Sequence, residues 1–545
     1  MERRKFIRNV TLGSAAGLTL GGIPLNLLAG NSALKRIASA SDNENILVFI
    51  QLHGGNDALN TLIPVSQYND YYNLRSNIAI PDYGTRKFIN VDTTIPEADQ
   101  VGLHPDMLSF KDMYDAGQVS IVQNVGYPDM NLSHFRGRDI VFMGGDAYDD
   151  YQSGWMGRFL NNVYPGYPDA YPNPDMLDPL GVELSGTLSL AYHRETGIPI
   201  GLNLGNPQQF YDLISSVGVD PPITIPDSHA GDELEYIMEF EKKSNQYAER
   251  LKDVYEAGSN SSVEYPEDYP YATQGNYSKN PLSPQLQLIA RMIKGGVKTK
   301  IFLCRIGGFD THGEQTMDYD PTLGIHASLL YHLSSAIKAF FDDLKILGID
   351  HKVLAMTFTE FGRRAASNAS YGTDHGTSTP VLLFGPGLNP GIFGTNPNLQ
   401  DLSNGNLKYN IDYRNIYTSV VQDWLGADDQ TLIDTGFSVW VDTKLPLIDG
   451  ATGVNDLSGN SGIDFRIYPN PVSDQLNIFY QLQKQGAVVF TVLDSSGRVV
   501  RKINQKGYNG DNQQSINIGE LPEGIYHLRI VQGNLKTSSQ FIKIR

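Results

Sequence analysis

The sequence predicts an α/β fold with a mainly parallel sheet, followed by a small all-β module. In the larger part, apolar runs alternate with helical patterns: the run at 301–306 precedes an amphipathic helix at 326–347, and a second run follows at 353–358. Such strand–helix–strand alternation is typical of a parallel sheet with helices on both faces. After residue 465, short alternating runs separated by turn residues indicate a β-sandwich instead.

Residues 1–40 are predicted to be a targeting segment rather than part of the fold. Arg3-Arg4-Lys5-Phe6-Ile7-Arg8 resembles a twin-arginine export signal, an apolar stretch spans 10–28, and Ala38-Ser39-Ala40 offers a small-residue cleavage site. The resemblance implies passage through the twin-arginine translocase. The alternative is an attached anchor, which the glycines and the short apolar length disfavour. No other segment of the sequence is apolar enough to be expected to cross a bilayer.

A core domain is expected over residues 42–440, with a loop-rich insertion at about 145–282 that forms a cap or a substrate-facing wall. Residues 232–257 are expected to form a charged surface helix, and residues 441–464 a linker. In the expected helix at 326–347, apolar side chains recur with the helical period. The other expected strands are 46–52 and 381–384, and the other expected helices are 284–294 and 414–425.

The overall charge and the cysteine content exclude some classes of protein. The net charge is −18, and it becomes about −23 without residues 1–40, which carry six Lys or Arg and one Glu. Such acidity argues against nucleic-acid binding and favours solubility. The single cysteine, Cys304, excludes an intrachain disulfide and is expected to be buried in a strand.

The module at 465–545 closely resembles the C-terminal sorting domain of type IX secretion substrates. The residues that carry the resemblance are Tyr468-Pro469-Asn470-Pro471, the turn at Gly497, Gly524-Ile525-Tyr526 and the basic end Lys543-Ile544-Arg545. The resemblance implies recognition by the type IX secretion machinery and a location at the outer-membrane surface or outside the cell. The alternative is an adhesive or carbohydrate-binding sandwich, for which no tryptophan platform is present.

Three loops that follow apolar runs contain Asp and His: Asp57 follows the first run, Asp310-Thr311-His312 the second, and Asp374-His375 comes after the third. Ligands of open α/β sheets bind beyond the carboxyl ends of the strands, so we expect these loops to meet. Carboxylates and imidazoles together suit zinc, manganese or iron. The alternative is that the Asp residues cap helices and the His residues bond the backbone.

The loop Thr373-Asp374-His375-Gly376 resembles the Asp-His-Gly metal loop of the alkaline phosphatase and sulfatase superfamily. The resemblance implies an alkaline phosphatase-like three-layer α/β/α sandwich and a divalent metal, for which we consider zinc, manganese or calcium. Asp310 and His312 would then be the middle ligands and Asp57 the first. The implied activity is hydrolysis of an anionic ester, a phosphate or sulfate, by metal-assisted attack of a hydroxyl.

Ser133 lies in the interval where that superfamily places its nucleophile, and Arg136 would steady the leaving oxyanion. The alternative for Ser133 is the N-cap of a helix. Glu360 and Arg363 directly follow the run at 353–358. Glu360 fits a ligand or a general base, and Arg363 fits an anion-binding group. Alternatively, the two form an ion pair that fixes their loop.

The core as a whole resembles the bacterial family named domain of unknown function 1501. This resemblance implies the fold of the same superfamily, and it implies an activity less firmly. The matching segments are Gln51 to Asp57, Leu103-His104-Pro105, Ser133 to Arg138, Gly154 to Arg158, Gly307 to Gln315, Glu360 to Arg363, and Asp374-His375-Gly376.

Two departures from the superfamily pattern keep a second class of function open. The only histidine after His375 is His527, inside the sorting module, and the Asp310–His312 spacing is tight. These departures favour a non-catalytic surface or secreted binding protein on a degenerate scaffold. A serine esterase of the α/β-hydrolase class is disfavoured, because the chain contains no Gly-x-Ser-x-Gly motif.

Overall fold

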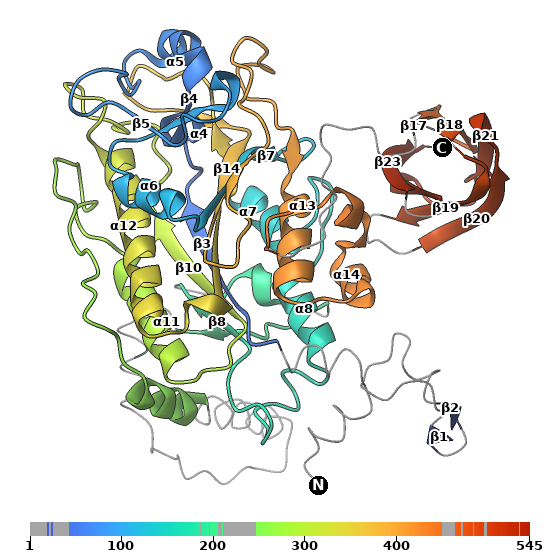
Figure 1. Cartoon of the computed structure of the whole chain (residues 1–545), viewed down its shortest axis with the longest axis horizontal. Coiled ribbons are helices and arrows are strands. Elements are labelled where there is room, and N and C mark those ends of the chain that lie inside the picture. Colours follow the sequence, from blue (N-terminus) through green and yellow to red (C-terminus); the bar gives the residue numbers. More distant parts are fainter. Residues whose placement is uncertain are drawn as a thin grey trace, which may run out of the picture.

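The computed structural model shows a large α/β body and a separate β-sandwich (Figure 1). The residues it describes are 19–20, 23–24, 43–185, 188–195, 197–204, 210, 247–449, 464–469, 472–482, 484–494, 499–532 and 535–544. Of the predicted targeting segment, only the short strands β1 (Thr19–Leu20) and β2 (Ile23–Pro24) are described. The rest of residues 1–40 lies outside the described residues.

The α/β body is built on a nine-stranded sheet with the order β15-β7-β14-β11-β3-β10-β8-β9, in which β16 also pairs with β7. Every pairing is parallel except those of β14, which runs antiparallel to β11 and β7. The predicted mainly parallel sheet is therefore confirmed. The strands are β3 (Ile46–His53), β7 (Val119–Gly126), β8 (Gly181–Leu184), β9 (Leu202–Asn203), β10 (Ile301–Gly307), β11 (Val353–Phe358), β14 (Thr379–Phe384), β15 (Gly391–Phe393) and β16 (Ile411–Asp412).

Helices cover both faces of this sheet, which gives the predicted three layers. Along β3, Val48 and Ile50 pack into the core under α6 (Leu108–Asp115), α11 (Ser283–Lys294) and α12 (Ile325–Ile346). Leu47 and Phe49 pack into the opposite core, under α7 (His134–Met143), α8 (Trp155–Val163), α13 (Tyr413–Ser419) and α14 (Asp429–Thr435). Burial on both faces explains why the strands are continuous apolar runs without alternation.

Most of the expected elements form, and three regions differ in detail. The expected helix at 414–425 is α13 followed by a π-helical turn, η5 (Val420–Trp424). The expected loop-rich insertion contains α8, β8 and β9, so part of it belongs to the sheet and its helical cover. Leu447 and Ile448, in the expected linker, pack into the core under α13. Of the expected helix at 232–257, residues 247–257 are described and helical.

Smaller elements surround the carboxyl end of β3. A three-stranded sheet pairs β4 (Leu62–Pro64) and β5 (Ile89–Asn90) with β6 (Val101–Leu103), next to the helices α4 (Ala58–Thr61) and α5 (Tyr68–Arg75). A two-stranded ladder pairs β12 (Gly362–Arg363) with β13 (His375–Gly376), so that Arg363 lies opposite His375. The remaining short helices are η1 (Val65–Gln67), η2 (Glu97–Asp99), η3 (Leu190–Tyr192), η4 (Asp350–Lys352) and η6 (Ser438–Thr443).

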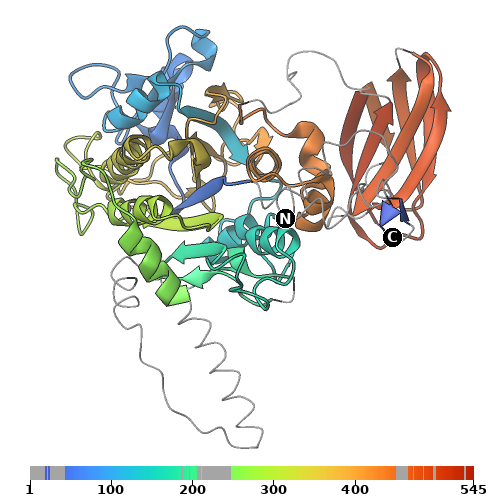
Figure 2. The same ribbon diagram turned by 60° about the horizontal axis from the view of Figure 1, so that its bottom comes forward.

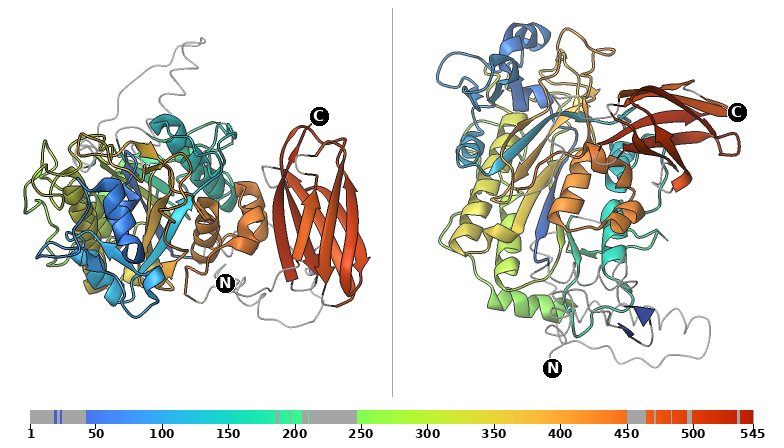
Figure 3. Two further views of the ribbon diagram at one scale, coloured as in Figure 1. Left: turned by 90° about the horizontal axis from the view of Figure 1, so that it is seen from above. Right: turned by 45° about the vertical axis from the view of Figure 1, so that its right-hand side comes forward.

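The C-terminal module is a sandwich of two antiparallel sheets, as predicted (Figures 2 and 3). Its core is a cluster of its own that contains Leu476, Val488 and Phe490. One sheet contains β17 (Asp464–Tyr468), β18 (Gln475–Leu482) and β21 (Gly510–Asn517), and the other β19 (Gly486–Asp494), β20 (Val499–Gly507), β22 (Gly524–Gln532) and β23 (Leu535–Lys543). Among the described residues, no helix is both long and apolar enough to cross a membrane.

Candidate metal centre

Five loops converge at one edge of the nine-stranded sheet. The parallel strands β7, β11, β3 and β10 all end at this edge, and β14, which runs the opposite way, begins there. The loops at 53–57, 127–134, 308–312 and 359–363 therefore meet the loop at 373–378. This is the edge at which open α/β sheets bind their ligands.

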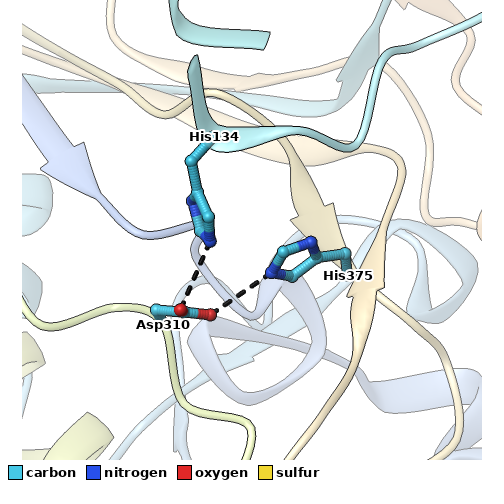
Figure 4. A group of neighbouring side chains, drawn as sticks. All are labelled: His134, Asp310 and His375. Atoms are coloured by element: carbon cyan, nitrogen blue, oxygen red, sulfur yellow. Dashed lines mark hydrogen bonds and ion pairs between the residues drawn. The ribbon is translucent and has the colours of Figure 1, made fainter. Parts of the chain in front are cut away.

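Three side chains from three of these loops form a compact group: His134, Asp310 and His375 (Figure 4). One ligand atom from each lies within 4.8 Å of the others. The Nε2 atom of His134 is 3.3 Å from Oδ2 of Asp310, and the Nε2 atom of His375 is 3.3 Å from Oδ1. His134 and His375 are about a quarter exposed and Asp310 about half, whereas the Nε2 atom of His134 is itself buried.

Both histidine rings are held from behind through their Nδ1 atoms. His134 Nδ1 lies 3.0 Å from Glu360 Oε1, and His375 Nδ1 lies 2.9 Å from the Leu132 carbonyl oxygen. A carbonyl oxygen can only accept, so Nδ1 of His375 carries the proton and donates it. In both rings Nε2 is the atom that faces Asp310. Metal-binding histidines show this same arrangement, in which the second nitrogen donates to a carboxylate or carbonyl.

His312 extends the group on the more exposed side. Its Nε2 is 3.3 Å from Asp310 Oδ1, and its Nδ1 is 3.3 Å from Asp374 Oδ1. Asp374 also accepts a hydrogen bond from Asn368 Nδ2, which lowers the pKa of its carboxyl group. The structure thus brings four of the five predicted metal ligands into one cluster: Asp310, His312, Asp374 and His375.

The donor set fits a cation. Burial lowers the pKa of His375, which favours the neutral ring with a free lone pair on Nε2. That lone pair faces a carboxylate oxygen at 3.3 Å, and two acceptors repel each other unless a cation or proton lies between them. Nitrogen and oxygen ligands of tetrahedral zinc, at bond lengths of about 2.0–2.1 Å, lie about 3.3–3.4 Å apart. Each Nε2 lies at a similar distance, 3.3 Å, from a different oxygen of Asp310.

Glu360 supports the group rather than joining it. Its carboxylate is completely buried, and Oε1 accepts a 2.8 Å hydrogen bond from the Gly54 amide besides contacting His134. The hydrogen bond to Glu360 raises the pKa of His134. Glu360 Oε2 is buried and has no hydrogen-bond partner in the described structure. Glu360 therefore lies behind His134 as seen from Asp310, and its role as a direct ligand or base stays a prediction.

Arg363 ties the converging loops together. Its guanidinium donates to the carbonyl oxygens of Gly54, Gly55, Phe309 and Thr373, and to Asp310 Oδ1 at 2.8 Å. Burial alone raises the pKa of Asp310, but the hydrogen bond and charge of Arg363 bring it below the ordinary value. Arg363 is 1% exposed, so its charge is directed at Asp310 and not at a solvent-borne anion. The described contacts include no Glu360–Arg363 ion pair.

Asp57 lies apart from this group, in contrast to its predicted role as a metal ligand. Arg75 Nη1 contacts both of its carboxylate oxygens, at 2.8 and 2.7 Å, and Gln315 Nε2 donates to Oδ2 at 2.7 Å. Oδ1 also accepts from the Leu59 amide, so Asp57 is the N-cap of α4. The carboxylate is 1% exposed and fully bonded, which corresponds to the helix-capping alternative.

Ser133 and Arg136 come from the start of α7. Ser133 is the exposed N-cap, and its side chain makes no capping hydrogen bond within the described structure. It directly precedes His134. The Arg136 guanidinium instead donates to the carbonyl oxygens of Asp149 and Ala147 and lies 3.7 Å from Asp150. The predicted oxyanion-steadying residue is therefore engaged by the loop at 147–150.

Sequence reasoning did not assign His134, which lies near His53 in this region. His53 Nδ1 lies 3.5 Å from Glu360 Oε1, and its ring centroid lies 6.2 Å from that of His134. The signal for His134 was the apolar run at 119–126, which is β7 and ends at the same edge. Because this run is a strand of the sheet, a histidine in the loop after it is expected at the same edge as Asp310, which also follows a strand.

Two family models match the chain. Residues 239–439 match the model described as Protein of unknown function (DUF1501), and residues 466–544 match the model described as Secretion system C-terminal sorting domain. No curated protein matches the sequence. The sorting domain confirms the predicted interaction with the type IX secretion system.

Several solved structures show a remote likeness. Dimeric latent PorU from Porphyromonas gingivalis has 17% identity and a TM-score of 0.14, and the match covers 15% of this chain and 9% of that chain. A protein in the alkaline phosphatase superfamily from Vibrio parahaemolyticus has 9% identity and a TM-score of 0.35, over 83% of this chain and 84% of that one. The lipoteichoic acid synthase LtaP from Listeria monocytogenes has 12% identity and a TM-score of 0.29, over 67% and 70%.

The layer architecture follows from the nine-stranded sheet and the two cores that flank it. The chain contains a DUF1501 region together with a secretion system C-terminal sorting domain, and the sorting domain implies export and a location at the cell surface or outside the cell.

Proposed function

We propose that this chain is an exported, metal-dependent hydrolase of phosphate or sulfate esters, with His134, Asp310 and His375 as metal ligands. The observation that carries the proposal is the anchoring of the two rings. Each Nδ1 is held by an acceptor, Glu360 or the Leu132 carbonyl, so that both Nε2 atoms converge on one carboxylate. Rings fixed in this way are ready to coordinate an ion.

The chemistry that we assign to the site is ester cleavage by a serine. A bound divalent cation would supply positive charge for the negative charge that develops on the ester oxygens. The nitrogen-containing ligand set favours zinc or manganese over calcium, which prefers oxygen ligands. Ser133 is the proposed nucleophile, because it is exposed beside His134 and its hydroxyl makes no capping bond. Its oxygen would bond to phosphorus or sulfur as the alcohol leaves, and water would then release the acid.

Two residues support a second candidate function, that of a non-catalytic surface binding protein. Asp57 is bonded to Arg75, and Arg136 is bonded to the loop at 147–150, so two groups expected to serve hydrolysis are engaged elsewhere. This candidate shares the export route. For the inner membrane we propose the twin-arginine translocase on the strength of Arg3-Arg4, which lie outside the described residues.

Metal analysis of the full chain tests the metal centre. The protein, purified without chelator, is expected to contain near-stoichiometric zinc or manganese and to lose it in His375→Ala. His351→Ala is the matched control, because His351 is exposed on η4 and should leave the metal content unchanged. No metal in the unaltered chain, even after metal addition, would contradict the metal centre.

Hydrolysis of chromogenic aryl phosphate and aryl sulfate esters separates the two candidate functions. Metal-dependent turnover supports the hydrolase, whereas bound metal without turnover of either ester supports the binding protein. A Ser133→Ala chain with full activity would reject Ser133 as the nucleophile.

A further inference from the structure

Two buried threonines stand next to the acidic and histidine residues of the metal centre. Thr311 lies between Asp310 and His312, and Thr373 directly precedes Asp374. The side chains of Asp310 and His312 are about half exposed, whereas Thr311 and Thr373 are 2% and 0% exposed. Each loop therefore turns its polar cluster residues towards solvent and its threonine into the protein.

Both threonines bind the same atom. The Thr311 hydroxyl donates to Gln315 Oε1 at 3.0 Å, and the Thr373 hydroxyl donates to it at 2.8 Å. Gln315 is completely buried, and its Nε2 donates to Asp57 Oδ2 at 2.7 Å. A carboxylate can only accept, so this contact fixes Nε2 on the side of Asp57 and leaves Oε1 for the two hydroxyls. One amide oxygen thus joins two loops that are far apart in the sequence.

The main chain shows the same close approach of the two loops. The Gln315 amide donates to the Tyr371 carbonyl oxygen at 2.9 Å, and the Thr373 amide donates to the Thr311 carbonyl oxygen at 3.0 Å. A Cβ atom at Gly372 would lie only 2.6 Å from that Thr311 oxygen. The loops are therefore in contact along the segment that precedes the cluster residues, and Gln315 belongs to this contact.

The separation of these loops matters because contacts within the metal centre run from one loop to the other. Asp310 Oδ1 lies 3.3 Å from His375 Nε2, and His312 Nδ1 lies 3.3 Å from Asp374 Oδ1. Ligand distances of a bound ion tolerate deviations of only about 0.2 Å. A small shift of one loop against the other would therefore disturb both pairs.

We propose that Gln315 is a positioning residue of the metal centre, which holds the loop at 308–312 at a fixed distance from the loop at 373–378 through Thr311 and Thr373. This inference rests on the proposed function, in which these loops carry metal ligands. Gln315 is completely buried, so it acts on the ligands through the two threonines. Loss of either hydroxyl removes one of the two hydrogen bonds at its amide oxygen and loosens the joint between the loops.

The valine variant Thr373→Val tests this role, because valine has nearly the size and shape of threonine but no hydroxyl. Competition with a chromogenic chelator, in the full chain, is expected to show a metal affinity about tenfold lower. Thr373→Ser keeps the hydroxyl and should restore the affinity. Thr311→Val is a second variant with the same expectation as Thr373→Val. Thr299→Val is the matched control, because Thr299 is 0% exposed and donates to the Pro179 carbonyl oxygen before the start of β10, at the opposite end of that strand from the metal centre.

Hydrogen exchange of the chelator-treated full chain tests the joint between the loops without metal. The Glu314 and Gln315 amides donate across the joint to the carbonyl oxygens of Ser370 and Tyr371, at 3.0 and 2.9 Å. Peptides that contain these two amides are expected to exchange faster in Thr373→Val than in the unaltered chain. The serine variant and the matched control should exchange like the unaltered chain.

The outcomes separate this inference from the proposed function. A chain that binds no metal, even after metal addition, would overturn the metal centre and the positioning role with it. Bound metal with the same affinity in both valine variants as in the unaltered chain would overturn the positioning role alone. Unchanged hydrogen exchange in both valine variants, or an equal loss of affinity in Thr373→Ser or in Thr299→Val, would also overturn it, because the hydroxyls would then not be the groups that hold the loops.

Discussion

Buried side chains, rather than the exposed ligands, set the geometry of the metal centre. Asp310 and His312 are about half exposed, whereas the side chains of Glu360 and Arg363 are 0% exposed. Each buried group fixes one member of the cluster: Glu360 fixes the His134 ring, and Arg363 fixes the Asp310 carboxylate. Partners of this kind tune a metal site without touching the ion. At the scale of single residues, Glu360 is therefore the most informative position to change.

Glu360→Gln is expected to lower the metal affinity of the chain by about 10–100-fold, because the amide carries no charge with which to polarise His134. Competition with a chromogenic chelator measures the affinity, and circular dichroism checks the fold. Glu97→Gln, on η2, is the control and should leave the affinity unchanged. Equal affinities for Glu360→Gln and the unaltered chain would show that Glu360 does not act on the metal centre.

Asp57→Ala is expected to destabilise the protein by about 3–5 kcal/mol, because it leaves the buried Arg75 charge without its partner. Urea denaturation measures the change. Asp115→Asn removes a partly exposed pair with Lys111 and should cost less than about 1 kcal/mol. Because Asp57 lies apart from the cluster, the folded variant should keep its metal. A folded Asp57→Ala chain without metal would return Asp57 to the ligand set.

The Asp57 carboxylate is also expected to make the stability of the protein depend on pH. Burial alone would raise the pKa of Asp57, but the charge and hydrogen bonds of Arg75 bring it below its ordinary value of about 3.9. A carboxylate whose pKa is lower in the folded than in the unfolded chain stabilises the folded state. This stabilisation is complete at pH values above the unfolded pKa, and it is lost as the pH falls through the folded pKa. The stability difference between the unaltered chain and Asp57→Asn should therefore be constant above about pH 5 and shrink below about pH 4. A constant difference down to acid unfolding would contradict this assignment.

At the scale of elements, the site depends on how closely two loops approach each other. Gly54, after β3, has φ +125°, and a Cβ atom there would lie 2.2 Å from the Asp310 amide nitrogen. The loop that carries Asp310 can therefore approach the end of β3 only because residue 54 is a glycine.

Gly54→Ala is expected to displace the Asp310 loop and to abolish stoichiometric metal binding, measured by elemental analysis. Gly84→Ala is the matched control, because Gly84 also has a positive φ, +82°, but has open space around its Cβ position. The control should show only the backbone strain, about 1–3 kcal/mol, with metal retained. Full metal binding by Gly54→Ala would show that the close approach is not required.

At the scale of the whole molecule, the described residues form an α/β body and a sandwich whose cores are separate. The sorting sandwich has its own core around Leu476, Val488 and Phe490. It lies beside the α/β body (Figure 3), and its strand β23 contacts η6. Its polar contact with the α/β body includes Arg529 Nε, 3.0 Å from Asp442 Oδ2. The metal centre lies wholly within the α/β body, so delivery and chemistry are physically separate.

Deletion of residues 464–545 is expected to stop delivery to the cell surface without changing metal binding. Fractionation of a host with type IX secretion measures delivery, and elemental analysis measures metal. The full-length chain in the same host is the control for delivery. Surface delivery of the shortened chain would contradict the role of the sorting domain, and loss of metal would contradict the independence of the two bodies.

The sequence by itself determined the layer architecture, the C-terminal sandwich and the edge at which the site lies. Those features follow from hydrophobic periodicity and turn residues, which act locally, and from the rule that ligands bind at the carboxyl ends of strands. Tertiary structure decided which residues meet there. Asp57 and Asp310 both follow apolar strands, yet only Asp310 joins the cluster, because Arg75 from α5 binds Asp57. His134 joins the cluster because β7 ends beside the start of β14 and because the contact with Glu360 orients its ring. Arg75 lies 18 residues from Asp57 and Glu360 lies 226 residues from His134, so neither pairing leaves a local pattern in the sequence.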